Sequence, residues 1–168
     1  LCVDGSAGVE VIIWARAVCL CASAINSAAL LRYSGVPDPH RVAGRSLRLH
    51  PGVAVAGQFD EVVEAWTGVP QSFECTEKLS FAPGARDRSW LIPAFAHPGG
   101  YAGIQPGFGQ RHAAFMRAYP RTAVVAAMLH DETRGEVSPD RHGRPKVRYE
   151  LTADDAAALW RGVHAAAE

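Results

Sequence analysis

The chain has 168 residues, of which 48% are hydrophobic and 20% are charged, and its formal net charge is zero. These values are ordinary for a globular domain with a core of its own. The neutral balance offers no electrostatic basis for binding nucleic acid or an anionic membrane. The longest apolar run, at 9–24, contains Glu10 and Arg16 and is too short for a transmembrane segment.

The first segments of the chain are predicted strands. Residues 8–15 (GVEVIIWA) are rich in β-forming residues and are expected to pair with a strand upstream, beyond a turn at Asp4-Gly5. Residues 18–21 (VCLC) are apolar and uncharged, which predicts a strand buried on both faces of a sheet.

A turn of small residues and a helix follow. Residues 22–24 (ASA) allow the backbone to approach a ligand closely, and the apolar spacing over 25–33 predicts a helix that ends at Gly35. A strand that enters a helix through a small turn is a common place for a nucleotide phosphate. An ordinary strand–helix junction has the same pattern, so this feature alone leaves both interpretations open.

The middle of the chain is predicted to form antiparallel strands. Residues 53–59 alternate in polarity, with a bulge expected at Gly57, and 60–68 suggest a short helix. Residues 71–79 also alternate, and 89–96 form a further strand, which Pro93 restricts to an edge or a bulge. One face of the strand at 71–79 carries three polar side chains, Ser72, Glu74 and Thr76, and the strand is expected to be exposed or to line a cavity.

The second half mixes helices and strands. A helix is predicted at 110–119 before Pro120, and a strand at 122–129. A hairpin turns through 140–143, and a terminal helix at 154–167 begins with a capping-box pattern. The order of elements predicts an α+β fold whose main sheet is mostly antiparallel, with flanking helices.

The stretch ASAINSAALLRYSGVP resembles the second signature of the glucose–methanol–choline (GMC) flavin oxidoreductases. Ala28 stands where the family usually has Pro or Ser, Pro37 where it usually has Gly, and Ser23 where many members have Gly. The matching positions are Ser23, Ala24, Ser27, Leu30, Leu31, Ser34, Gly35 and Val36.

Two later segments extend the resemblance over nearly the whole chain. Residues 44–51 are similar to the family's Gly-x-Asn-Leu-x-x-His-Pro segment, with Ser46 in place of Asn. Residues 130–155 resemble a bacterial and long-chain alcohol oxidase subgroup. His50 within the first segment either faces the flavin region or is a loop histidine with local hydrogen bonds.

The resemblance implies a domain organisation and a cofactor. Residues 1–44 would carry the buried strand and helix that end an FAD-binding domain, and 45–168 would form the substrate-binding domain. FAD contact is expected at the backbone of Ala22 and Ser23, with Cys21 and Ala24 beside it. The partner would be a small-molecule alcohol, and the aromatic and aliphatic strands allow a lipophilic one. Ser72, Glu74 and Thr76 of the antiparallel sheet would line the substrate site.

The implied activity is alcohol oxidation with hydride transfer from a CH–OH group to FAD. The G-x-G-x-x-G fingerprint is absent, and no residue matches the family's catalytic histidine motif, so no catalytic residue is assigned. We therefore expect an internal fragment that is inactive alone, and its first residue, Leu1, agrees with that.

Two other functions remain open. One is a non-catalytic binding or scaffold domain derived from the same fold. The other is an enzyme that uses His50, His97 or His130 with carboxylates, although no metal-ligand spacing supports a metal site.

The four cysteines, at positions 2, 19, 21 and 75, give a last indication. Cys19 and Cys21 share one face of a predicted strand, too far apart for an easy disulfide, and no second pair completes a zinc site. Buried free thiols are therefore predicted, which fits a reducing, cytoplasmic location.

Overall fold

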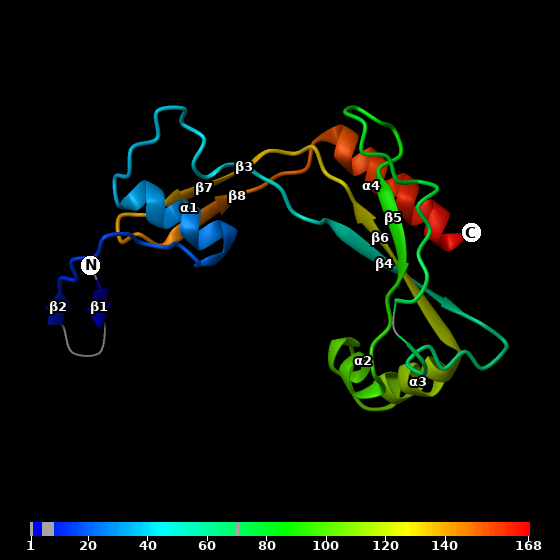
Figure 1. The fold of residues 1–168 in the computed structure, drawn as a ribbon. Helices are drawn as coiled ribbons and strands as arrows, with labels where there is room; N and C mark the ends of the chain where they lie inside the picture. The colour runs from blue at the N-terminus through cyan, green and yellow to red at the C-terminus, as the bar shows by residue number, and fades with distance from the viewer. Residues whose placement is uncertain (1, 5–8, 70) are drawn as a thin grey trace. The chain divides into compact units, whose positions relative to one another are not determined.

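The computed structural model describes residues 2–4, 9–69 and 71–168, and its fold is of the α+β class, as predicted (Figure 1). The helices are α1 (Ser23–Tyr33), α2 (Pro98–Ile104), α3 (Gln110–Ala118) and α4 (Ala153–Ala167), with a 3-10 turn at Tyr119–Arg121. The strands are β1 (Cys2–Asp4), β2 (Val9–Val11), β3 (Arg45–Leu47), β4 (Gly52–Gln58), β5 (Ser89–Pro93), β6 (Thr122–Leu129), β7 (Gly135–Pro139) and β8 (Pro145–Arg148).

The strands form three sheets, in the orders β1-β2, β3-β7-β8 and β4-β6-β5. By its internal contacts the chain divides into two compact units. Unit 1 contains Leu1–Gly44 and Val137–Val147, and unit 2 contains Arg45–Glu136 and Arg148–Glu168. No helix in the described part of the chain is long and apolar enough to cross a membrane.

Unit 1 is built around α1 and the tip of the β7–β8 hairpin. The Arg32 guanidinium donates a 2.5 Å hydrogen bond to the carbonyl oxygen of Val137, and the Val137 N–H donates to the carbonyl oxygen of Gly44 at 2.6 Å. Gly44 has φ +69°, and a Cβ there would lie 2.2 Å from the Val137 oxygen, so the close approach requires glycine. These contacts place 137–147 with α1, which sequence order alone does not predict.

The predicted buried strand at 18–21 is wrong. Residues 17–21 have no strand partner among the described residues, and their side chains are exposed. A strand needs a neighbour to bond its N–H and C=O groups, which an apolar pattern does not supply. The prediction of buried thiols fails with it, because Cys19, Cys21 and Cys75 are free and exposed.

Unit 2 contains the antiparallel sheet β4-β6-β5. The β4–β6 register runs without interruption from Gly52 opposite Met128 to Gln58 opposite Thr122, so the bulge predicted at Gly57 is wrong. In β5, Leu91 lies opposite Ala127 of β6. The predicted strands at 53–59, 89–96 and 122–129 are thus confirmed, although β5 already ends at Pro93.

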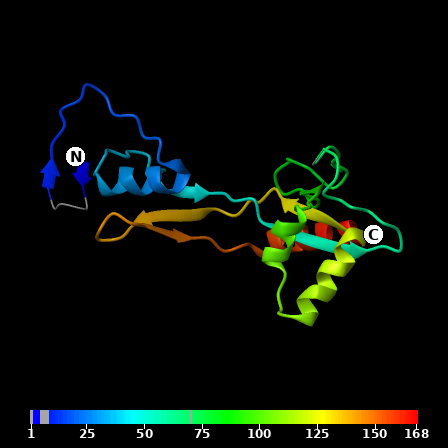
Figure 2. The same cartoon turned by 90° about the horizontal axis from the view of Figure 1, so that it is seen from below.

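Helix α4 covers one face of this sheet and contacts all three strands (Figures 1 and 2). Leu91, Ala127 and Leu129 are buried and belong to that face. On α4, Ala158 is buried, and its carbonyl oxygen accepts a 3.1 Å hydrogen bond from the Ser89 hydroxyl. Alternation along the strands places Trp90, Met128, Ala54, Ala56 and Val124 on the opposite face.

Of the remaining secondary-structure predictions, some are confirmed and others are wrong. The helices at 25–33, 110–119 and 154–167 and the hairpin around 140–143 are confirmed. The helix expected at 60–68 is a set of turns, and the strand expected at 71–79 shows two isolated bridges, Cys75 to Leu91 and Leu79 to Arg88. Helix α2 was not predicted, because Pro98-Gly99-Gly100 has the composition of a turn.

Substitution of Gly162 tests how closely α4 packs on the sheet. A Cβ there would lie 2.4 Å from Ser89 Cβ and 3.3 Å from Ala127 Cβ. Gly162→Ala should therefore lower the free energy of unfolding by about 1–3 kcal/mol through overpacking, measured by chemical denaturation. The control is Gly103→Ala in α2, where a Cβ meets no atom within 4 Å among the described residues, and which should raise stability by up to about 1 kcal/mol. Equal effects of the two substitutions would contradict the packing described.

Candidate functional site

The predicted cofactor residues lie at the beginning of α1 in unit 1. Cys21, Ala22, Ser23 and Ala24 are all exposed. The Ala22 N–H donates to Ser27 Oγ at 3.2 Å. Within the described part of the chain α1 has no side-chain cap, and its first turn contains no acidic residue. Beyond the Ala22 N–H, the N–H groups that begin the helix therefore have no capping side chain, and its positive dipole end faces no acidic residue of the first turn, an arrangement that suits an anion.

The predicted substrate residues lie in unit 2 but do not share a strand face. Ser72, Glu74 and Thr76 are exposed on an irregular segment. The Ser72 hydroxyl donates to the carbonyl oxygen of Val69 at 2.5 Å. Glu74 borders a cavity of about 360 Å³ near the end of α4, together with Cys75. The structure thus does not bring the three side chains together at one site.

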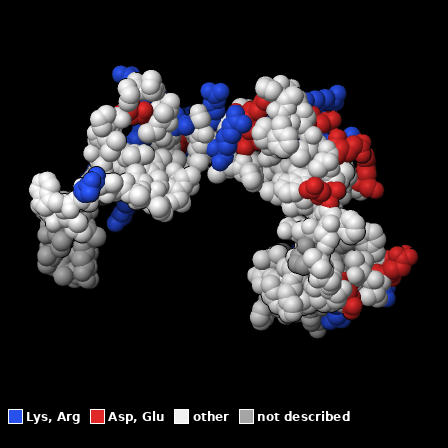
Figure 3. All heavy atoms as spheres, in the orientation of Figure 1, with Lys and Arg blue, Asp and Glu red and all other residues white. Residues whose placement is uncertain are grey.

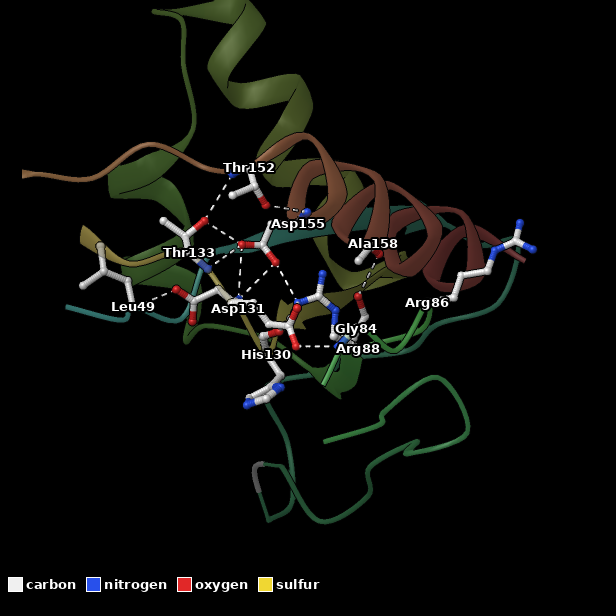
Figure 4. A network of polar contacts seen from close by, with 12 residues as sticks. Leu49, Gly84, Arg86, Arg88, His130, Asp131, Thr133, Thr152, Asp155 and Ala158 are labelled. Carbon is white, nitrogen blue, oxygen red and sulfur yellow. Dashed lines mark hydrogen bonds and ion pairs between the residues drawn. The ribbon is translucent and has the colours of Figure 1, made fainter. Parts of the chain in front are cut away.

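A buried ion pair connects α4 to the sheet (Figure 4). Arg88 is 2% exposed and Asp155 is 0% exposed, and Arg88 Nη1 lies 2.7 Å from Asp155 Oδ1. The same guanidinium nitrogen lies 3.4 Å from Glu132 Oε2. The Thr133 N–H and hydroxyl donate to Asp155 Oδ2 at 2.8 and 2.5 Å, so the carboxylate is well supplied with donors.

Two opposing effects set the ionisation of Asp155. Burial raises the pKa of this carboxyl, whereas the Thr133 hydroxyl, the N–H groups of Glu132 and Thr133, and the Arg88 guanidinium lower it. The lowering effects prevail, so the pKa lies below its ordinary value. Asp155 is therefore a buried carboxylate that stays charged, and its charge is matched by Arg88.

A second buried carboxylate, Asp131, lies where β6 ends. It is 3% exposed, and its Oδ2 accepts hydrogen bonds from the Tyr149 hydroxyl at 2.5 Å and from the Leu49 N–H at 3.3 Å. Burial, followed by the bond to Asp131, raises the pKa of Tyr149 well above its ordinary value. Tyr149 therefore remains a neutral donor, and the bonds fix the course of 48–50 beside the sheet.

Next to this carboxylate is a cavity of about 300 Å³. Its polar lining includes Arg48, His50 and His130. The His130 ring points away from the Arg88–Asp155 pair (Figure 4) and packs edge-on against Phe81, with 5.0 Å between ring centroids. The structure thus brings together two of the three histidines that the sequence singled out, whereas His97 caps the N-terminus of α2.

A larger, apolar groove of about 760 Å³ lies on the same side of the sheet, toward α2 and α3. Ala54 and Ala56 of β4 and Val124 of β6 line it from the sheet, and Ile104 and Phe115 from the helices. Its polar side chains include Gln71 and Gln105. Figure 3 shows few charged side chains over α2 and α3 in that view.

An aromatic stack supports one wall of this groove. The rings of Tyr101 and Tyr119 lie 3.8 Å apart between centroids, and Trp66 stacks on Tyr119 at 4.9 Å. The Tyr119 hydroxyl donates to the carbonyl oxygen of Ala96. Burial, together with the nearby Tyr119, raises the pKa of Tyr101, so the Tyr101 phenol remains neutral.

Sequence reasoning missed most of these groups for identifiable reasons. Arg88 and Asp155 are charged, and such residues are normally read as exposed. The β4–β6 register, continued by two residues, places His50 opposite His130, but that register is not visible in the sequence. Among the described residues, no cluster of three His, Cys, Asp or Glu side chains could hold a metal ion.

Comparison with known proteins shows which family the chain is similar to. Residues 1–52, which include the exposed turn and α1, match the family model for GMC oxidoreductase. Two uncharacterized GMC-type oxidoreductases of Mycobacterium tuberculosis, from strains H37Rv and CDC 1551, are each 33% identical to this chain over 153 residues. The chain is thus homologous to GMC-type oxidoreductases over most of its length. The alignments cover 90% of the chain but 23% of each relative's length. No solved structure matches it.

The family match covers the two units unequally. The matched residues include all of α1 and the segment up to Gly52, where β4 begins. Most of the sheet β4-β6-β5 and helix α4 lie beyond that match, whereas the similarity to the two mycobacterial GMC-type proteins extends over 153 residues of the chain.

Removal of Asp155 should destabilise the protein strongly. Asp155→Ala leaves the buried Arg88 charge without its closest partner, so the free energy of unfolding should fall by about 3–5 kcal/mol. The matched control is the neighbouring Asp154→Ala, which removes an exposed carboxylate from the same first turn of α4 and should cost about 0.3–1 kcal/mol. Urea denaturation of both variants measures the difference. Similar losses of stability in the two variants would contradict the inference that removal of Asp155 leaves a buried charge uncompensated.

The pH dependence of stability gives a second test. Because folding lowers the pKa of Asp155, its contribution is present above the unfolded-state pKa of about 3.9. It is lost as the pH falls from that value through the folded-state pKa. The stability difference between the wild type and Asp155→Asn should therefore shrink on acidification below about pH 4. The difference for Asp154→Asn should change little, and a constant difference for Asp155→Asn would contradict the assignment.

Proposed function

We propose that this chain is part of an FAD-dependent oxidoreductase that acts on the CH–OH groups of alcohols. The observation that supports this best is the family match over 1–52, which coincides with an uncapped helix N-terminus on small, exposed residues. When bound, FAD would accept a hydride from the carbinol carbon while the hydroxyl proton passes to a base, which leaves a carbonyl product.

The residues at the beginning of α1 fit a flavin dinucleotide. Ala22, Ser23 and Ala24 are exposed and small, so their backbone can come close to a phosphate. The Ala22 N–H donates to Ser27 Oγ, but within the described part of the chain no side chain caps the N–H groups of Ser23 and Ala24, which could therefore donate to phosphate oxygens. Cys21 would lie beside the same cofactor. We assign no catalytic base to this chain.

The two-domain organisation enters the same proposal. Residues 1–44 would end the FAD-binding domain, and 45–168 would form the substrate-binding domain. The boundary of unit 1 at Gly44 supports this division. The contacts of Val137 with Gly44 and Arg32 add the hairpin tip, 137–147, to the first unit, so the chain would return once to the flavin side.

The substrate would be a lipophilic alcohol. The groove of about 760 Å³ supports this, because its sheet wall consists of small apolar residues such as Ala54 and Ala56 and its other walls carry Ile104 and Phe115. Burial of an apolar alcohol there would gain about 25 cal/mol per Å². Among Ser72, Glu74 and Thr76, none belongs to its lining, so their role in substrate binding is less well supported.

The exposed thiols Cys19, Cys21 and Cys75 would stay reduced in the cytoplasm.

Flavin content tests the proposal in the whole protein that carries this chain. Ala24→Trp should lower the bound FAD, measured by absorbance after purification, at least about tenfold, because a bulky side chain would block the approach of the phosphates. The control is Asn26→Trp, which is also exposed on α1 and lies beyond the proposed contact. Wild-type protein that cannot be reconstituted with FAD would overturn the proposal. Flavin that alcohols do not bleach would overturn the alcohol specificity.

A further inference from the structure

The connection between α2 and α3 exposes its apolar side chains. Ile104, the last residue of α2, is 73% exposed, and Phe108 is 93% exposed. Single exposed apolar residues are common on protein surfaces, but these two lie on one short loop, 104–109, which projects away from the sheet of unit 2 (Figure 2). A fully exposed aromatic ring forgoes the free energy of its burial. The loop therefore has the properties of a tip that enters an apolar medium.

The backbone on either side of Phe108 fixes how its ring is presented. Gly107 and Gly109 have φ values of +106° and +60°, a region that residues with a Cβ rarely adopt. Nε2 of His112 in α3 donates to the carbonyl oxygen of Ala102 in α2 at 2.9 Å, which joins the two helices beside the loop. The exposure of Phe108 is thus built into the local fold.

The charged side chains of this region are all positive. Although the net charge of the whole chain is zero, residues 88–130 contain no Asp or Glu. Helix α3 exposes Arg111 and Arg117. The Arg111 side chain passes beside the loop, because a Cβ on Gly107 would lie 3.4 Å from Arg111 Cδ. The acidic segment at 60–64 bonds Pro120, beyond the opposite end of α3. An apolar tip next to exposed arginines is typical of segments that lie on an anionic lipid surface.

We infer that the loop at 104–109 docks on an anionic lipid surface. Phe108 and Ile104 would enter the boundary between headgroups and acyl chains, while Arg111 and Arg117 would face the headgroups. A protein partner fits the loop less well, because a stable protein interface buries about 800 Å² on each side and a projecting tip with two apolar side chains offers far less. A lipid surface is fluid and accommodates such a tip.

The same loop borders the apolar groove of unit 2. Ile104 lines that groove of about 760 Å³, so docking would place one wall of the groove at the lipid. A lipophilic molecule dissolved in the bilayer would then reach the groove without crossing water. This consequence rests on the proposed function, whereas the binding of lipid does not.

Sedimentation with sucrose-loaded vesicles tests the inference. The chain should bind vesicles of phosphatidylcholine with about 30% phosphatidylglycerol at least about fivefold more tightly than vesicles of phosphatidylcholine alone. Phe108→Ser should weaken binding to the mixed vesicles about tenfold, because an apolar side chain no longer enters the lipid. Arg111→Gln should weaken it about fivefold through the loss of one positive charge. Both side chains are exposed, so neither substitution disturbs the core.

The matched control is Phe73→Ser, because Phe73 is 81% exposed in the same unit but lies next to Glu74; its binding to the mixed vesicles should be unchanged. Full binding by Phe108→Ser would overturn the insertion of the loop. Equal binding of the wild type to the two kinds of vesicle would overturn the assignment of an anionic surface.

Two further measurements separate lipid from a protein occupant of the loop. If the whole protein that carries this chain does not bind the mixed vesicles, another part of the polypeptide covers the loop and the inference is wrong. A dimer in sedimentation equilibrium that Phe108→Ser dissociates would assign the loop to contact between copies and would also overturn it. None of these measurements uses flavin or an alcohol, so their failure is distinguishable from failure of the proposed oxidoreductase function.

Discussion

The buried ion pair of Arg88 and Asp155 is the constraint on which unit 2 depends. Two charges with exposures of 2% and 0% are expensive to desolvate, and their attraction compensates only when other donors complete the coordination. Thr133 and the backbone of Glu132 supply those donors. The participants come from the residue just before β5, the segment after β6 and the first turn of α4. Satisfying one carboxylate therefore fixes the position of all three.

That arrangement determines where unit 2 has space. Helix α4 occupies one face of the sheet, with Gly162 allowing close contact to Ser89 and Ala127, so cavities at the sheet surface form mainly on the other face. There the side-chain sizes decide their location. Small residues at Ala54 and Ala56 leave the groove toward α2 and α3, whereas Trp90 and Met128, at the other end of the strands, wall the smaller cavity beside His130.

Local patterns predicted the elements that depend on local chemistry. Apolar spacing, together with the terminating residues Gly35 and Pro120 and the predicted cap Thr152, was sufficient to predict α1, α3 and α4. The Thr152 hydroxyl does accept from the Asp155 N–H at 3.1 Å. Yet the Asp155 carboxylate bonds Arg88 and Thr133 rather than closing a capping box, since tertiary partners compete for it. The segment at 18–21 had a strand-like pattern but has no strand neighbour among the described residues, and 71–79 pairs only through two isolated bridges. Pairing is not a local property of the sequence. The class of fold was thus predictable, whereas the buried charges were not.

The cavity beside His50 and His130 follows from one structural fact that no sequence motif contains. His50 lies in a segment that resembles a family motif, and His130 follows an apolar strand, with no pattern to relate them. The pairing of Gly52 with Met128 relates them at once, because an antiparallel register continued by two residues sets the two side by side. The Leu129 N–H, bonded to the Pro51 carbonyl oxygen at 2.8 Å, carries the ladder past the end of β4. Any substitution that slips this register by one residue would turn every side chain of β4 to the opposite face. It would therefore dismantle the groove and the cavity together, although the two share no lining residue.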